Sequence, residues 1–167
     1  MIKKLISLII LFFLLGCSGL EFVYNQNIIS NHLDNKVIVA INGDDRSEIA
    51  LEIKRGIKEN KDAAEYLLEI NSTKNEKNQA ILEDGTASKV VISHSLNYSL
   101  KNISNNCIIM EKLIVTSSTF DSKSSGYNFG TDISAKEVKN QNIKENINKF
   151  YNYLERDFGQ GGCIDED

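Results

Sequence analysis

Apolar and polar residues alternate most regularly between residues 90 and 100. The apolar positions are Val90, Ile92, Leu96, Tyr98 and Leu100. Serine or asparagine occupies most of the positions between them. A period of two predicts a β-strand with one buried face and one solvated face. His94 falls on the apolar side, where a half-buried histidine with satisfied hydrogen bonds is expected, not a ligand.

Three further segments have the character of strands. Residues 36–41 form a short apolar run that begins after Lys36, as expected for a strand buried on both faces. Residues 65–75 begin apolar and end polar, which predicts a strand that runs beyond the core at its far end. Residues 107–120 are rich in β-branched residues and should pair with residues 90–100 in a long hairpin, with the polar segment 101–106 as the reversal.

Two helices are predicted from a period near 3.6. Residues 46–59 carry an isoleucine at every fourth position. The expected cap of this helix is either an aspartate of the preceding turn, residues 42–45, or Ser47. A second helix is expected over residues 133–158. Its apolar stripe consists of Ile143, Ile147, Phe150, Tyr151 and Leu154.

The element order is therefore β-α-β-β-β-α. Two helices with one apolar stripe each can cover only one face of a four-stranded sheet. The expected fold class is α+β, a two-layer sandwich with a mixed sheet and both helices on one face. The other face of the sheet must stay in water or meet a partner. Residues 36–158 have the length of a single domain.

The beginning of the chain has the pattern of a secretory signal. Lys3 and Lys4 precede an apolar run over residues 5–15. As a helix this run covers roughly 16 Å, about half of a hydrocarbon core, so a permanent span is not expected. We therefore expect residues 1–16 to be removed.

The run ends in Leu14-Leu15-Gly16-Cys17, which matches the lipobox of bacterial lipoproteins. Cys17 would then carry diacylglycerol and an N-linked acyl chain, a covalent anchor that holds the protein to a membrane; no other cofactor is expected. An ordinary secretion signal that stops near a cysteine is the alternative. Ser18 follows the cysteine, where an aspartate would favour the inner membrane, so the outer membrane is expected. Residues 17–35 would form a tether.

Charge and cysteine content narrow the possible functions. Removal of Lys3 and Lys4 takes the formal charge from −4 to −6, which disfavours a nucleic-acid partner. Outside the cell's reducing interior, Cys107 and Cys163 can form a disulfide. Cys107 can equally be a small buried residue. Residues 159–167 are expected to be a flexible acidic tail.

Catalytic and metal-binding patterns are absent from the sequence. His32 and His94 are the two histidines, neither in a recognisable catalytic setting, and Cys-x-x-Cys does not occur. The glycines of residues 159–162 do not follow a strand or open a helix, so a phosphate site is not indicated. We expect no enzyme and no metal.

Six short strings, in the same order, resemble the LPS-assembly lipoprotein family, LptE. They are Phe22-Val23-Tyr24, Asp45-Arg46, Tyr66-Leu67-Leu68, residues 84–89, residues 96–100 and Ser118-Thr119-Phe120. The chain departs from the family pattern where it lacks a proline after the lipidated cysteine and has Phe120 where a tyrosine is more usual.

The resemblance implies a protein that plugs the outer-membrane β-barrel LptD and helps to deliver lipopolysaccharide to the outer leaflet. A lipopolysaccharide headgroup is anionic and requires cations. The candidates are Lys101, at the expected hairpin tip, with Lys89 and Lys112. Lys54, Arg55, Lys58 and Lys61 form a second basic cluster. For each of these lysines a solvated surface position is the alternative.

Two other functions remain open. One is an accessory lipoprotein of an ABC-type lipid transporter. The other is a periplasmic lipid-binding lipoprotein with a closed hydrophobic cavity, although the regular alternation at residues 90–100 favours a filled core.

Overall fold

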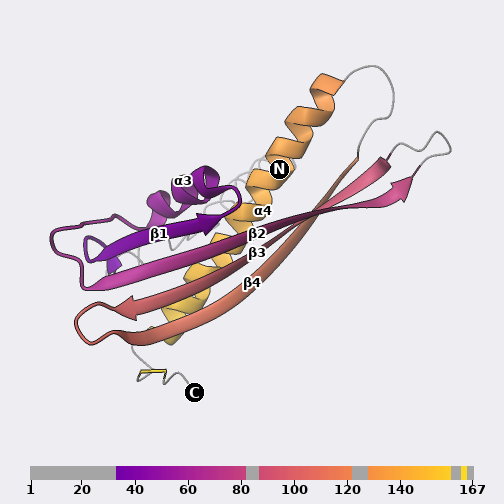
Figure 1. Ribbon diagram of the computed structural model, residues 1–167. Helices are drawn as coiled ribbons and strands as arrows, with labels where there is room; N and C mark the ends of the chain where they lie inside the picture. Colours follow the sequence, from indigo (N-terminus) through magenta and orange to yellow (C-terminus); the bar gives the residue numbers. More distant parts are fainter. Residues whose placement is uncertain (1–32, 82–86, 122–127, 159–162, 165–167) are drawn as a thin grey trace, which may run out of the picture.

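The computed structural model describes residues 33–81, 87–121, 128–158 and 163–164 (Figure 1). The signal segment, Cys17, most of the expected tether and His32 lie outside these ranges. The elements follow the order β1, α3, β2, β3, β4 and α4. Their bounds are Val37–Gly43, Arg46–Gly56, Tyr66–Ile81, Ala87–Asn102, Cys107–Asp121 and Asn128–Asp157.

β1 and β2 are joined through α3 and lie parallel, with Val37 opposite Tyr66 and Ile41 opposite Ile70. The chain leaves β1 through Gly43, whose φ is 94°. A side chain at position 43 would overlap the carbonyl oxygen of Ser72, so glycine is required where β1 turns away from β2. The next N–H, that of Asp44, donates to the same carbonyl at 3.1 Å.

The other strands pair antiparallel in the sheet order β1-β2-β3-β4. The alternation over residues 90–100 has the predicted consequence: Ile92, His94, Leu96, Tyr98 and Leu100 are all buried. β2 extends six residues beyond the predicted end because its backbone continues to pair with β3. The side chains of residues 76–79 in this extension are polar and exposed. Backbone hydrogen bonds therefore extend this hairpin past the core.

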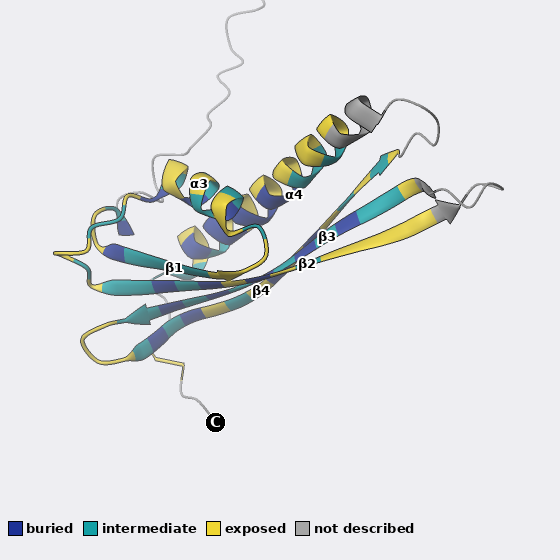
Figure 2. Cartoon of the chain, turned by 45° about the horizontal axis from the view of Figure 1, so that its top comes forward, coloured by how far each residue is buried: buried dark blue, intermediate teal, exposed yellow. Residues whose placement is uncertain are grey.

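The two helices lie on one face of the sheet (Figure 2). α3 packs on β1 and on α4, and α4 runs along β3 and β4. All five residues of the predicted stripe on α4 are buried, and so are Ile49, Ile53 and Ile57. The rings of Phe150 and Tyr98 stack with centroids 4.1 Å apart at the centre of the core.

The structure confirms the predicted α+β two-layer sandwich and its four-stranded mixed sheet. We call the sheet surface that faces away from α3 and α4 the open face. Its residues are those that alternate with the buried ones, for example Ser93, Ser95 and Asn97 on β3. Ser93 and Ser117 are hydrogen-bonded across this face at 2.8 Å.

The reversal between β3 and β4 is shorter than predicted. It was expected over residues 101–106 with Lys101 at its tip, but β3 continues to Asn102 and the turn occupies residues 103–106. Asn102 pairs with Cys107, and a register shift beside Lys101 accommodates an extra residue of β4. Lys101 is thus a strand residue, because pairing with β2 and β4 holds its backbone.

Cys107 and Cys163 form a disulfide, which decides between the two roles left open for Cys107. The bond attaches the chain after α4 to the start of β4. Ile164 then donates its N–H to the carbonyl of Ile108 at 2.8 Å, in an antiparallel bridge.

Candidate functional site

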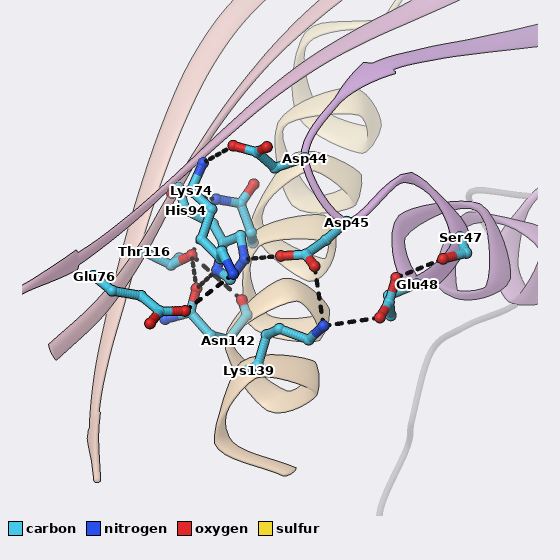
Figure 3. A network of polar contacts seen from close by, with 11 residues as sticks. Asp44, Asp45, Ser47, Glu48, Lys74, Glu76, His94, Thr116, Lys139 and Asn142 are labelled. Atoms are coloured by element: carbon cyan, nitrogen blue, oxygen red, sulfur yellow. Dashed lines mark hydrogen bonds and ion pairs between the residues drawn. The ribbon is translucent and has the colours of Figure 1, made fainter. Parts of the chain in front are cut away.

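Polar side chains interrupt the apolar packing between the sheet and α4. His94 of β3, Thr116 of β4, and Asn142 and Asn146 of α4 are buried, three of them with no exposed surface. We call these four residues the polar layer; Figure 3 labels His94, Thr116 and Asn142. Because burying an unpaired polar group is costly, the partners of each one determine whether the layer stabilises the fold.

Asn142 holds the centre of the layer. Its amide satisfies every neighbour when the nitrogen donates to Thr116 Oγ1 at 2.8 Å and to His94 Nδ1 at 2.9 Å. The amide oxygen then accepts the backbone N–H groups of Ser118 at 3.0 Å and Ser117 at 3.2 Å. The orientation of His94 follows: its Nδ1 accepts, and its Nε2–H donates to Asp45 Oδ2 at 3.0 Å.

Asn146 extends the layer by one helical turn. Its amide nitrogen donates to the carbonyl of Ile114 at 2.9 Å and to Thr116 Oγ1 at 3.1 Å. Its oxygen accepts the hydroxyl of Tyr98 at 2.9 Å. Burial raises the pKa of Tyr98, so its hydroxyl remains a donor. The layer is therefore continuous with the aromatic stack of the core.

At its other end the layer reaches the surface through Asp45, Lys139 and Glu48. Lys139 Nζ lies 3.0 Å from Asp45 Oδ1 and 2.8 Å from Glu48 Oε1. The hydrogen bond from Lys139 is the largest cause that lowers the pKa of Glu48 to about 2. Burial raises the pKa of Asp45, but hydrogen bonds from His94 and Lys139 outweigh it and the net shift is downward. The ion pairs of Lys139 with Asp45 and Glu48 thus join the start of α3 to α4.

Asp45 occupies the N-cap position that the turn residues 42–45 predicted, but it does not cap the helix. Its backbone is left-handed, with φ 50°, and its side chain makes no capping hydrogen bond. The carboxylate instead accepts from His94 and Lys139. Asp45 thus connects the start of α3 to β3 and α4.

This arrangement does not support nucleophilic or acid–base chemistry. His94 has no exposed surface, and both ring nitrogens already have protein partners. Within the described part of the chain, no group of three histidine, cysteine or acidic residues is placed to hold a metal ion. What the polar layer does is fix the register of α3 and α4 on the sheet.

The sequence contained a signal for this layer that the pattern analysis missed. Lys139, Asn142 and Asn146 are spaced three and four apart, so they share one helix face. That face borders the apolar stripe, and His94 lies on the apolar side of β3. Polar residues on two facing apolar surfaces are expected to pair with each other.

The three candidate lysines do not form one cluster. Lys101 belongs to the open face and pairs with Glu69 at 3.1 Å. Lys112 lies on the helix side, 3.4 Å from Asp157 Oδ2 and 5.5 Å from the centre of the Tyr153 ring. Lys89 is exposed near the opposite end of β3, twelve residues from Lys101 and roughly 40 Å away along an extended strand. Each lysine is therefore a separate candidate.

The open face carries two exposed apolar side chains beside one edge of the sheet. Leu113 and Val115 of β4 are 68% and 55% exposed, whereas Ile114 and Thr116, which point to the helices, are buried. β4 is an edge strand. Among the described residues, the one backbone pairing on its outer edge is that of Ile108 with Ile164. Apolar side chains beside an unpaired strand edge form a candidate contact surface.

No helix within the described ranges has the length and apolar character needed to span a membrane. The lipidation candidate Cys17 lies outside those ranges. The expected attachment to a membrane therefore rests on the sequence pattern around Cys17.

No protein-family model and no curated protein sequence matches this chain. Several solved structures share its fold. A minor lipoprotein from Acinetobacter baumannii aligns with a TM-score of 0.60 and 10% identity, over 80% of this chain and 99% of that one. Lipoprotein B from Nitrosomonas europaea aligns at 0.54 and 11% identity, over 77% and 86%. A candidate lipoprotein from Caulobacter crescentus gives 0.53 and 15%, over 77% and 93%.

Proposed function

We propose that this chain is a non-catalytic lipoprotein, anchored in the outer membrane through acylated Cys17, that plugs an LptD-type β-barrel and assists lipopolysaccharide delivery. The observation that carries the proposal is a lipobox, Leu14-Leu15-Gly16-Cys17, ahead of a two-layer fold that bacterial lipoproteins also have. The six sequence strings that resemble LptE support the choice of partner.

The open face suits contact with the inside of a barrel. Interiors of large outer-membrane barrels are polar, and most open-face side chains are serine, asparagine, threonine or charged residues. Leu113 and Val115 add an apolar contact at the edge of that face. Since α3 and α4 cover the other face, the open face is the side of the sheet available to a partner.

The partner can be identified by recovery from detergent-solubilised outer membrane. We expect the tagged mature protein to recover one large β-barrel in one-to-one amount. Changing Leu113→Lys and Val115→Lys together should lower that recovery at least tenfold, because each ammonium group would lose water at the contact without gaining a partner. Intact-mass measurement of the same preparation reports the acyl chains on Cys17.

A matched control is Ile133→Lys, because Ile133 of α4 is also an exposed apolar residue, at 53%. This variant should recover the barrel as well as the unchanged protein. Recovery of an inner-membrane ATPase complex in place of a barrel would refute the barrel plug and favour the transporter accessory. Bound lipid without a protein partner would favour the lipid-binding alternative.

For lipopolysaccharide itself, Lys101 is the preferred contact, with Lys89 and Lys112 as further candidates. Lys101 is 30% exposed, and a lipid phosphate would compete with Glu69 for its ammonium group. We expect Lys101→Glu to weaken lipopolysaccharide binding by the mature protein about tenfold, the value of one charged hydrogen bond. Lys144→Glu, an exposed change on α4, serves as control. Equal affinity of the Lys101 variant and the unchanged protein would remove this assignment.

A further inference from the structure

The outer face of α3 combines an exposed leucine with cations. Leu51 is 61% exposed on the side of α3 that faces away from the buried Ile49 and Ile53. Lys54 lies three residues after Leu51, on the same face of α3. Lys58 follows the end of the helix by two residues. Arg55 and Lys61, which are exposed as well, complete the basic cluster seen in the sequence. We call Leu51 and these four cations the α3 surface.

The charges of the α3 surface remain accessible. Arg55 pairs with Glu52, and Lys58 lies 3.8 Å from Asp34, but the Arg55 and Lys58 side chains are 61% and 76% exposed. Ion pairs at such exposure are weak and can be exchanged for another anion. Lys54 and Lys61 have no ion-pair partner among the described residues. The exposed charged side chains between residues 46 and 62 are five cations and one acid, Asp62, whereas Glu48, Glu52 and Glu59 are half-buried. The exposed charge of this segment is therefore basic, in a chain whose formal charge is −4.

The α3 surface also adjoins the point where the N-terminal segment joins the domain. Asn35 donates its N–H to the carbonyl of Lys58 at 2.9 Å, and the N–H of Lys58 donates to Asp34 Oδ1 at 3.0 Å. Leu33 is fully buried in the core. Leu33 lies sixteen positions after Cys17, a span of roughly 55 Å at full extension. An anchor at Cys17 therefore keeps the α3 surface within reach of the membrane that holds it.

We propose that the α3 surface docks on the anionic phospholipid headgroups of the membrane to which Cys17 is attached. The proposal rests on the lipid anchor of the proposed function and adds an orientation to it. Each lysine or arginine near an anionic bilayer favours the docked state about fivefold, and an exposed leucine contributes further by entering the interface. The anchor removes most of the cost of bringing the two surfaces together.

Docking through the α3 surface leaves the proposed partner surface free. α3 lies on the helix side of the sheet and packs against β1, which is the edge opposite β4. Leu113 and Val115 face the other way, on the open side of β4. The anchored domain can then contact lipid and a barrel at the same time.

Lysine acetylation rates measured by mass spectrometry test the docking. The mature acylated protein is placed on vesicles of phosphatidylcholine and on vesicles of phosphatidylcholine mixed with phosphatidylglycerol. We expect Lys54, Lys58 and Lys61 to be acetylated at least fivefold more slowly on the anionic vesicles. Lys136 and Lys144 of α4, which are also exposed, serve as internal controls and should react at the same rate on both.

A variant of Leu51 tests whether this face is the one that docks. Leu51→Glu should restore rapid acetylation of Lys58 and Lys61 on anionic vesicles, while Ile133→Glu, the same change on α4, should leave their protection intact. Equal rates on the two vesicle types, or equal protection of Lys136 and Lys144, would overturn the proposal.

Flotation of the same samples distinguishes failure of the docking surface from failure of the anchor. Protein that floats with phosphatidylcholine vesicles but shows no selective protection has the anchor and lacks the docking surface. Protein that floats only with anionic vesicles, with Lys54, Lys58 and Lys61 protected, uses the α3 surface and lacks the anchor.

Discussion

Replacing Asn142 by leucine is expected to lower the free energy of unfolding by about 3 kcal/mol. Leucine has nearly the same size, so the loss arises from hydrogen bonds rather than from a cavity. The substitution leaves His94 Nδ1 and the backbone N–H groups of Ser117 and Ser118 buried without the partner that Asn142 provides. Urea denaturation followed by circular dichroism measures the change.

The control is Asn148→Leu, because Asn148 lies on the exposed face of the same helix. Its effect should stay within about 0.5 kcal/mol. A double change, His94→Leu with Asn142→Leu, should cost less than the sum of the two single changes, since removal of both partners leaves fewer unpaired groups. A loss below 1 kcal/mol for Asn142→Leu alone would mean that the polar layer is not needed for stability.

Periodicity was sufficient to predict the elements that build the core. The alternation around Leu96 and Tyr98 and the stripe from Ile143 to Leu154 both reflect burial on one face, and burial is what the structure has at those positions. The fold class followed because two single-striped helices can cover one face of one sheet. The ends of β2 and β3 were less predictable, since polar residues such as Lys77, Asn78 and Lys101 are held there by backbone pairing.

The contacts of Asp45 could not be predicted from a local pattern. Asp45 contacts His94 and Lys139, which lie 49 and 94 residues away in the chain. Its position before α3 indicated a helix cap, but its carboxylate accepts hydrogen bonds from His94 of β3 and Lys139 of α4 instead. His94 was correctly predicted to be satisfied, although the structure buries it completely.

The three lysines show the same limit. Lys101 and Lys112 belong to one hairpin, but the strand register places them on opposite faces of the sheet. Lys101 therefore pairs with Glu69 and Lys112 with Asp157 of α4. Their separation depends on which side of each strand is covered. Sequence distance alone could not provide that information.

Removal of the disulfide should be the second large effect. Changing Cys107→Ser and Cys163→Ser together is expected to lower the free energy of unfolding by about 4 kcal/mol, because the bond closes a loop with a sequence separation of 56 residues and restricts the unfolded chain. Cys163 is exposed and Cys107 half-buried, so little packing is lost with the sulfur atoms. Urea denaturation of the unchanged protein, with and without reductant, should reproduce the same difference.

The slope of the unfolding free energy against urea concentration shows whether the disulfide acts on the unfolded or the folded state. If the crosslink acts mainly on the unfolded chain, the reduced protein and the double serine variant should have a steeper urea dependence, since an uncrosslinked chain exposes more surface. A large loss of stability with an unchanged slope would locate the effect in the folded state, where the bond holds Ile164 against Ile108. No loss at all would refute the assignment, because a closed loop of this length cannot leave the entropy of the unfolded chain unchanged.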